Sequence, residues 1–342
     1  MGNVHEDTQS AGGGAAPESG APASVSGPRP EGPGAHEPSG LAQLTTKQLA
    51  WRSFRRHRLA VASAVALILL TLACIVLPFT THYTYSGLDF GHEFEGPGSR
   101  HWLGTDVLGR DTFTRLFYAG RISLSVALAA TVSAGILGTI IGALAGFYGG
   151  AADAALMRTA DLFLAVPYLV VLLIVSTVFD AGLAGVVITL ILFLWMPTAR
   201  TVRGVFLSLR EKEFVEAARA AGASNLRIMF SQMLPNAMGP VIVSVTLLIG
   251  NAILAESALS FLGFGIQPPT PTWGNLLADA RYSFFEAAWP MVMPGLAIAI
   301  TVLLVNLLGD GLRDALDPYQ RVIQPTKWAP SGSEHDTGRT TS

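Results

Sequence analysis

Apolar residues are concentrated in six stretches of the chain, and none of these stretches contains Lys, Arg, Asp or Glu. They cover residues 59–79, 122–147, 162–179, 181–199, 237–255 and 287–309. Each is close to the ~20 residues that an α-helix needs to cross the hydrocarbon core of a bilayer. The pattern therefore predicts six transmembrane helices.

The composition agrees with this interpretation. Of the 342 residues, 50% are hydrophobic and only 13% are charged, whereas about 25% are charged in an average soluble domain. Backbone polar groups find no water in hydrocarbon, so only helices and closed barrels span it, and these runs are too long and too unalternating for barrel strands. The predicted fold class is an all-α polytopic membrane protein.

The positions of Lys and Arg predict the orientation, because positive residues next to spans stay preferentially in the cytoplasm. With the N-terminus inside, 17 of the 22 Lys and Arg residues lie on the cytoplasmic side and five lie outside. Both termini are therefore predicted to be cytoplasmic. The formal net charge of -2 gives no reason to expect nucleic acid as a partner, and the basic residues from Arg52 to Arg58 are explained as the anchor of the first span.

Loop composition divides the chain further. Residues 1–45, rich in Gly, Ala, Pro and Ser, hold too little apolar surface to fold and are predicted to be a disordered cytoplasmic tail. The remaining predicted parts are an anchor with the first span at 46–80, an external loop with an interfacial helix at 81–117, a core at 118–312 that contains a cytoplasmic loop at 200–236, and a C-terminal tail at 313–342.

Residues for catalysis are missing from the expected patterns. None of Lys47, Lys212 and Lys327 stands in a phosphate-binding Gly-x-x-x-x-Gly-Lys-Ser/Thr loop, and all seven histidines fall outside the predicted spans. Cys74, the only cysteine, is predicted to be a buried membrane thiol. The chain is therefore predicted to be no enzyme and to bind no metal or cofactor of its own.

The segment from Glu211 to Pro235 is the most informative loop. Its first part is a strong helix former with Glu213 and Glu216 on one face, and Gly222 can take the left-handed conformation that ends a helix. A second amphipathic piece follows, capped by Ser224 or Asn225 and ending at Pro235. The pattern alone leaves two interpretations open, a protein-docking element and a helix that rests on lipid headgroups.

Residue identities favour docking. Glu216-Ala217-Ala218, then Gly222, and later Leu234-Pro235 resemble the EAA loop of permease subunits in binding-protein-dependent ABC importers. This resemblance implies that the loop fits a groove on an ATPase subunit and carries the conformational signal. Gln232 departs from the family pattern, which usually has Ile there. The implied ATPase-coupling residues are Glu213, Glu216, Ala217, Ala218, Ala221, Gly222, Leu234 and Pro235.

A second segment extends the resemblance. Gly104-Thr105-Asp106 and Gly109-Arg110-Asp111, followed by Arg121-Ile122-Ser123-Leu124, look like the entry motif of C-type permeases of dipeptide, oligopeptide and nickel importers. From the residues alone, Thr105 or Asp106 is predicted to cap an interfacial helix. Further matches at 261–275 and 306–314 bring the coverage to roughly residues 59–319.

Small residues and prolines inside the spans concern packing. Gly138, Gly142 and Gly146 recur at every fourth residue of the second span, a pattern that lets transmembrane helices approach closely. Pro167 in the third span permits a kink, because proline cannot donate the backbone hydrogen bond of a helix interior.

One ionisable residue follows the fifth span directly. Glu256 lies 17 residues past Gly239, which at ~1.5 Å per residue places it near the outer end of that helix. We expect Glu256, with Asn251 and Ser257, to face the translocation pathway or its outer gate, where the amino terminus of a peptide or a cation passes. The alternative is a hydrogen bond to a neighbouring helix or snorkelling of the side chain to the interface.

The resemblance implies a type I ABC importer permease fold and a permease subunit that forms half of the pathway for short peptides. The implied partners are a second, related permease, two ABC ATPase subunits that bind ATP and Mg, an extracytoplasmic solute-binding protein and membrane lipid. Two alternatives remain: transport of nickel or another small solute, and, from a different class, an ATP-independent channel or membrane scaffold.

Overall fold

The computed structural model describes residues 46–179 and 182–316. The two predicted tails lie outside these ranges, apart from the first residues of the C-terminal one. Within them the chain is helical, and the one β-type pairing there is an isolated antiparallel bridge between Thr105 and Asp111. The predicted all-α fold is therefore confirmed.

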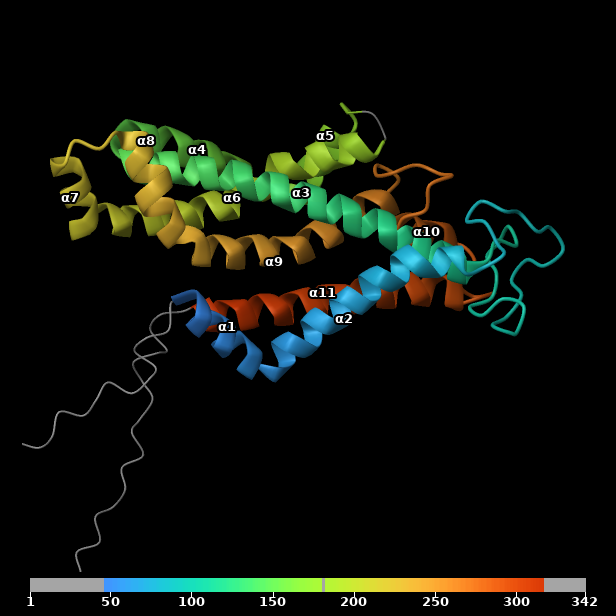
Figure 1. Cartoon of the computed structure of the whole chain (residues 1–342). Helices are drawn as coiled ribbons and strands as arrows, with labels where there is room; N and C mark the ends of the chain where they lie inside the picture. The colour runs from blue at the N-terminus through green and yellow to red at the C-terminus, as the bar shows by residue number, and fades with distance from the viewer. Residues whose placement is uncertain (1–45, 180–181, 317–342) are drawn as a thin grey trace, which may run out of the picture. The chain divides into compact units, whose positions relative to one another are not determined.

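The helices follow one another along the chain with few long connections (Figure 1). Their bounds are α1 Thr46–Arg56, α2 Arg58–Val76, η1 Leu77–Phe79, α3 Thr112–Tyr148, α4 Gly150–Ala165, α5 Tyr168–Ser176, α6 Leu183–Arg210, α7 Glu213–Ala220, α8 Asn225–Arg227, η2 Ile228–Met233, α9 Leu234–Phe261, α10 Trp273–Ala280 and α11 Trp289–Leu316.

Five helical segments of the described chain are long and apolar enough to cross a membrane: Arg58–Phe79, Thr112–Tyr148, Leu183–Arg210, Asn225–Phe261 and Trp289–Leu316. A sixth candidate is the pair formed by α4 and α5, which is bent by 93°. Taken as one broken span, this pair completes the six predicted transmembrane segments.

The third predicted span is not a straight helix. α4 ends at Ala165, Val166 is extended with φ -97° and ψ 143°, and Pro167 precedes α5. The proline ring crowds the residue before it and disfavours the helical conformation there. The kink expected at Pro167 is thus a complete break between two helices.

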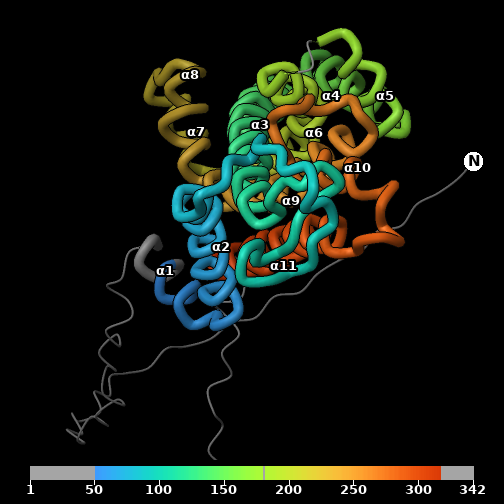
Figure 2. The backbone as a smooth tube through the Cα atoms, turned by 90° about the vertical axis from the view of Figure 1, so that its right-hand side faces the viewer, coloured from blue at the N-terminus to red at the C-terminus, as the bar shows by residue number. Residues whose placement is uncertain are grey.

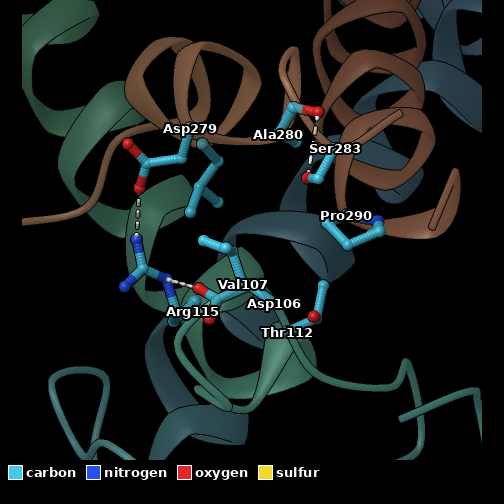
Figure 3. Close-up of a pocket in the computed structure, with 9 residues that line it drawn as sticks. Asp106, Val107, Thr112, Arg115, Asp279, Ala280, Ser283 and Pro290 are labelled. Carbon is cyan, nitrogen blue, oxygen red and sulfur yellow. Dashed lines mark hydrogen bonds and ion pairs between the residues drawn. The ribbon is translucent and has the colours of Figure 1, made fainter. Parts of the chain in front are cut away.

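The second predicted span begins ten residues earlier than expected. α3 starts at Thr112, and Figure 3 shows Thr112 and Arg115 close to its beginning. Its N-cap is Asp111, whose carboxylate accepts a hydrogen bond from the Thr114 N–H at 2.7 Å. The prediction that Thr105 or Asp106 caps a separate interfacial helix is therefore wrong, because these two residues belong to the turn before the helix.

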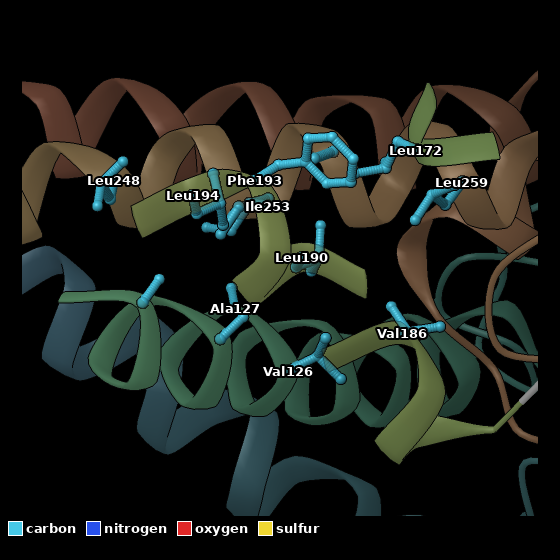
Figure 4. Close-up of a cluster of buried hydrophobic side chains, with 14 of the residues drawn as sticks. Val126, Ala127, Leu172, Val186, Leu190, Phe193, Leu194, Leu248, Ile253 and Leu259 are labelled. Atoms are coloured by element: carbon cyan, nitrogen blue, oxygen red, sulfur yellow. The ribbon is translucent and has the colours of Figure 1, made fainter. Parts of the chain in front are cut away.

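The core lies where α3, α6 and α9 pack together, with α5 beside them (Figure 4). The three predicted small residues of α3 face α6 as a packing stripe. A Cβ atom on Gly142 would touch the Ala199 carbonyl and lie 2.8 Å from Val202 Cβ, and one on Gly146 would lie 2.6 Å from Phe206 Cβ. Glycine at these positions is what lets the two helix backbones come this close.

Helices α2 and α11 pair beside this core, as both Figure 1 and Figure 2 show. A Cβ atom on Gly311 would collide with Ala60, so the two backbones meet closely here as well. Much of the apolar surface of α2 is exposed, including Ile68 (58%) and Leu69 (60%). A helix that is apolar on nearly every side, with this much of it uncovered, suits a lipid-facing position.

Candidate coupling site

The loop between α6 and α9 contains a short helix that ends at a glycine. α7 runs from Glu213 to Ala220, and Gly222 follows with φ +78°. The Gly222 N–H donates to the Arg219 carbonyl at 2.9 Å, and the Ala223 N–H donates to the Ala218 carbonyl at 3.1 Å. This pair of bonds is the Schellman motif, and it reverses the chain after α7 as the sequence predicts.

One face of this loop is anchored in the protein. Val215 of α7 has no exposed surface, and the same is true of Ile228 and Met233 of η2. They belong to a buried cluster with Phe206 of α6 and Phe147 of α3. The position of α7 is therefore fixed by packing on three transmembrane helices, not by the chain connections alone.

The opposite face is open. Among the predicted coupling residues, Ala218 and Leu234 are half-buried and pack against the buried cluster. The others are exposed: Glu213, Glu216, Ala217, Ala221, Gly222 and Pro235. The short alanine and glycine side chains leave the backbone accessible, and the two carboxylates flank them. The exposed predicted residues of α7 and of the turn after it, Glu213, Glu216, Ala217, Ala221 and Gly222, form a small surface that also carries the exposed Arg219, which we call the α7 face.

The second half of the loop differs from the prediction. No separate helix is present, because the chain stays helical from Asn225 to Phe261. Residues Ile228–Met233 form a π-helical turn, in which the Leu234 N–H donates to the Met229 carbonyl five residues earlier. Leu234 follows this turn, and Pro235, which lacks an N–H donor, comes next in the first turn of α9. π turns are rare in proteins, and those that do occur are often found at functional sites.

A groove beside this loop was not predicted. It has a volume of about 640 Å³ and lies between α3 and α9, with η2 at one end. Its lining is almost entirely aliphatic and includes Ile136, Ile140, Met229, Phe230 and Met238. No sequence pattern marks such a groove, because its walls come from segments about one hundred residues apart and read individually as ordinary transmembrane stretches.

The predicted entry motif, residues 104–111, forms a tight turn before α3. Gly104 and Gly109 have φ values of +70° and +71°, and a Cβ atom on them would lie 2.5 Å from Trp289 Nε1 and 2.7 Å from the Asp89 carbonyl carbon, respectively. Only glycine fits these two positions. Thr105 accepts the Glu95 N–H at 2.8 Å and donates to the His92 carbonyl at 2.5 Å, which ties the turn to the preceding loop.

Charged residues of this turn form an ion-pair network with α10. Arg110 Nε donates to Asp106 at 2.7 Å, and its terminal nitrogen donates to Asp279 of α10 at 3.0 Å. Arg115 donates to the same Asp279 oxygen at 3.3 Å and is only 4% exposed (Figure 3). The small cavity that they border, about 20 Å³, has room for about one water molecule.

Removing the charge of Asp279 tests this network. We expect Asp279→Asn to lower the free energy of unfolding by about 1–2 kcal/mol, since Arg110 and Arg115 would share Asp106 alone and the Arg115 guanidinium is nearly buried. The apparent melting temperature of the purified protein in detergent measures the change. Glu286→Gln, a neutralised exposed carboxylate with no ion pair in the described chain, is the control. Equal melting temperatures for both variants would contradict the prediction.

The residues predicted to face the pathway do not share one surface. Asn251 is exposed on α9, whereas Glu256 has no exposed surface and Ser257 is buried. The Glu256 carboxylate accepts hydrogen bonds from Ser123 of α3 at 2.9 Å and from Ser260 at 2.8 Å. The alternative of a hydrogen bond to a neighbouring helix is what the structure shows for Glu256.

The spanning helices place the chain in the class of multi-pass membrane proteins. Two family models narrow it. "Binding-protein-dependent transport system inner membrane component" matches residues 138–322, and "N-terminal TM domain of oligopeptide transport permease C" matches residues 45–97.

Relatives with names that refer to transport match most of the chain. It is 39% identical to the dipeptide transport system permease protein of Alkalihalophilus pseudofirmus over 80% of this chain and 90% of that one. It is 41% identical to the oligopeptide transport system permease protein of Mycobacterium tuberculosis, over 81% and 96%. It is 40% identical to the glutathione transport system permease protein of Pectobacterium atrosepticum, over 78% and 89%.

The chain therefore belongs to the family of binding-protein-dependent transport system inner membrane components. It is a multi-pass membrane protein and the permease subunit of an ABC transport system. The predicted membership of this family is thereby confirmed. The entry motif at residues 104–111 lies between the two matched ranges, and the roles of the individual residues remain predictions.

Proposed function

We propose that this permease forms half of the pathway through which an ABC importer takes up short peptides. The names of the three relatives support the substrate class, because they refer to dipeptides, oligopeptides and glutathione. These names favour peptides over nickel or another small solute. Selection among peptides falls to the solute-binding protein that gives the family its name.

One observation carries the coupling part of the proposal: the α7 face is open on one side and anchored on the other. The exposed side offers Glu216 and Ala217 to a partner, while Val215 transmits any displacement to the buried cluster beneath. Arg219 adds a second link, because its guanidinium lies 5.8 Å from the ring of Phe147 at the end of α3. The partner is an ATPase subunit that itself binds ATP and Mg.

The same proposal includes an orientation of the chain in the membrane. The excess of Lys and Arg on the predicted inner segments puts both termini and the α7 face in the cytoplasm. α9 starts at the coupling loop and extends for 28 residues, about 42 Å, before the chain reaches α10. The entry motif and α10 then lie on the extracytoplasmic side, where the solute-binding protein delivers the peptide.

The apolar groove between α3 and α9 is the surface that we assign to the second permease subunit. Its aliphatic lining belongs to spanning helices and lies next to the coupling loop. Two permeases that meet along this groove would enclose the pathway between them, and the exposed Asn251 of α9 is the residue that we retain as a pathway candidate. Alternating access then follows from rigid-body motion of the two helix bundles.

Co-purification with the ATPase subunits of the same transport system tests the coupling proposal. We expect Glu216→Lys combined with Gly222→Asp to reduce ATPase recovery at least about tenfold, because a reversed charge and an added side chain would disturb a docked surface. Glu286→Lys is the matched control. It makes the same charge reversal at an exposed carboxylate between α10 and α11.

The outcomes decide whether the α7 face is the docking surface for the ATPase. Loss of the ATPase in the double variant alone, with normal membrane insertion, supports the coupling site. Equal recovery with all variants would show that the α7 face is not the docking element. If no ATPase is recovered even with the unaltered chain, the coupling proposal is wrong.

A further inference from the structure

Helix α10 is short, yet several specific contacts fix it to the transmembrane bundle. It contains the residues Trp273–Ala280 and connects to α9 and α11 through loops. Trp273, at its first position, is 1% exposed and donates from its indole nitrogen to the Leu116 carbonyl of α3 at 3.1 Å. Gly120 forms the seat for this ring, because a Cβ atom there would lie 2.8 Å from Trp273 Cζ2.

A chain of hydrogen bonds leads from α10 to Glu256. The Trp273 backbone N–H donates to Ser123 Oγ at 3.2 Å, and the Ser123 hydroxyl in turn donates to the Glu256 carboxylate at 2.9 Å. The other carboxylate oxygen accepts the hydroxyl of Ser260 at 2.8 Å. Ser123 belongs to α3, Glu256 and Ser260 to α9, and Trp273 to α10, so this one buried carboxylate connects three helices.

The free-energy cost of burying Glu256 suggests that this residue has a role beyond packing. A carboxylate without exposed surface is expensive to bury, and no basic side chain of the described chain forms an ion pair with Glu256. An apolar residue would pack α9 at lower cost. Polar networks of this kind fix one relative position of the elements that share them, because every member loses its partner when an element shifts.

The far end of α10 is held as well. Asp279 pairs with Arg110 and Arg115, which lie in the entry turn and the first turn of α3. α3 and α9 both continue to the coupling loop, where Phe147 and Met233 belong to the cluster under the α7 face. A displacement of that face can therefore reach α10 along α3 and α9, whose opposite ends contact it.

We infer that Glu256 is a positioning residue for transport: through Ser123 and Trp273 it locks α10 to α3 and α9, so that the three helices move as one body. This inference rests on the proposed coupling function. In it, α10 is the part of the permease that opens or closes the extracytoplasmic side when the ATPase subunits displace the α7 face. Glu256 itself does not contact the transported peptide.

Two measurements test the lock, and the first needs neither ATP nor partners. Ala280, buried at 4% exposure beside the small cavity, is replaced by cysteine in a Cys74→Ala background, and its alkylation by N-ethylmaleimide is timed. We expect Ser123→Ala and Glu256→Gln each to accelerate alkylation at least about fivefold, because the first removes a buried hydrogen-bond partner and the second replaces one of the two acceptor oxygens that Ser123 and Ser260 use by an N–H donor. Ser125→Ala, an exposed serine on the same helix, should leave the rate unchanged.

The second measurement compares ATP hydrolysis with uptake of a radiolabelled tripeptide by the complete transporter in proteoliposomes. We expect Ser123→Ala to leave hydrolysis within about twofold and to reduce uptake at least about fivefold, which is uncoupling. A merely structural defect would lower both rates together, and that result would overturn the inference. Alkylation rates equal to those of Ser125→Ala would also overturn it.

The two levels of the proposal fail differently. If the unaltered chain recovers no ATPase, the coupling function is wrong and the role of α10 in transport falls with it. If ATPase binding is normal and the alkylation rate does not respond to Ser123→Ala, the coupling function stands and the lock is wrong. Should Glu256→Gln not accumulate in the membrane, Ser123→Ala alone decides between these results.

Discussion

Replacing Gly142 with valine should prevent the native packing of α3 against α6. A Cβ atom at this position already touches the Ala199 carbonyl and lies 2.8 Å from Val202 Cβ, and valine adds two methyl groups to it. Backbone on the opposite side cannot move out of the way as a flexible side chain can. We expect a loss of about 3 kcal/mol or more in the free energy of unfolding, which is a large part of the stability of a typical domain.

The measurement is the yield of monodisperse protein after detergent extraction, together with its apparent melting temperature. Gly204→Ala is the matched control, because Gly204 lies in α6 with nothing within 4 Å of an added Cβ atom. Alanine favours the helix over glycine by about 1 kcal/mol, so the control should be as stable as the parent or slightly more stable. A Gly142→Val protein with unchanged yield and melting temperature would show that α3 and α6 are not in close contact.

Substitution of Asp111 by alanine should have an effect of similar size at the other end of α3. The carboxylate caps the helix through the Thr114 N–H and also accepts the Thr114 hydroxyl at 2.6 Å. It pairs with His101 at 2.9 Å, and both side chains are almost fully buried, at 3% and 1% exposure. Loss of the cap and of a buried partner together should cost about 3–5 kcal/mol.

A second Asp–His pair in the same loop provides the comparison. Asp89 lies 3.1 Å from His92, with both side chains about 40% exposed. The hydrogen bond from His92 lowers the pKa of Asp89, so any stability from this pair is present at neutral pH and decreases as the pH falls through that lowered pKa. At neutral pH, Asp89→Ala should change the melting temperature far less than Asp111→Ala, since exposed pairs contribute little. Equal changes in melting temperature for the two variants would show that burial does not determine the contribution of these Asp–His pairs to stability.

Sequence reasoning predicted the spans well because the bilayer imposes a simple rule on them. The six uncharged runs correspond to five spanning helices and the bent pair α4–α5, and α7 ends just before Gly222, the residue predicted to end it. Such features can be predicted because they depend only on residues that are close together in the sequence. The break at Val166 and Pro167 was anticipated as a kink for the same reason, although its size was not.

What sequence reasoning missed depends on partners distant in the chain. The start of α3 was placed too late, because the uncharged run begins only after Arg121, an exposed residue that α3 includes. The missed first turns also contain Arg115, whose charge is balanced by Asp279 more than 160 residues away. Glu256 was predicted to face the pathway, but it is buried and bonded to Ser123. The sequence gives no sign of this contact, because Ser123 lies 133 residues earlier. The sequence does not show whether a given carboxylate is buried or exposed, because its surroundings are set by the fold.

The π-helical turn at Ile228–Met233 has a consequence for insertions and deletions in this chain. A π turn holds one residue more than an α turn, and each residue of an α-helix advances the side chains by about 100° around the axis. Deleting one residue within the turn, such as Ser231, would convert it to an α turn and leave the phase of the helix on either side intact. The same deletion within α9 would rotate Glu256 and every residue after it by about 100° relative to the α7 face. This turn is therefore the place where the length of the chain can change without altering which side chains α9 directs into the protein.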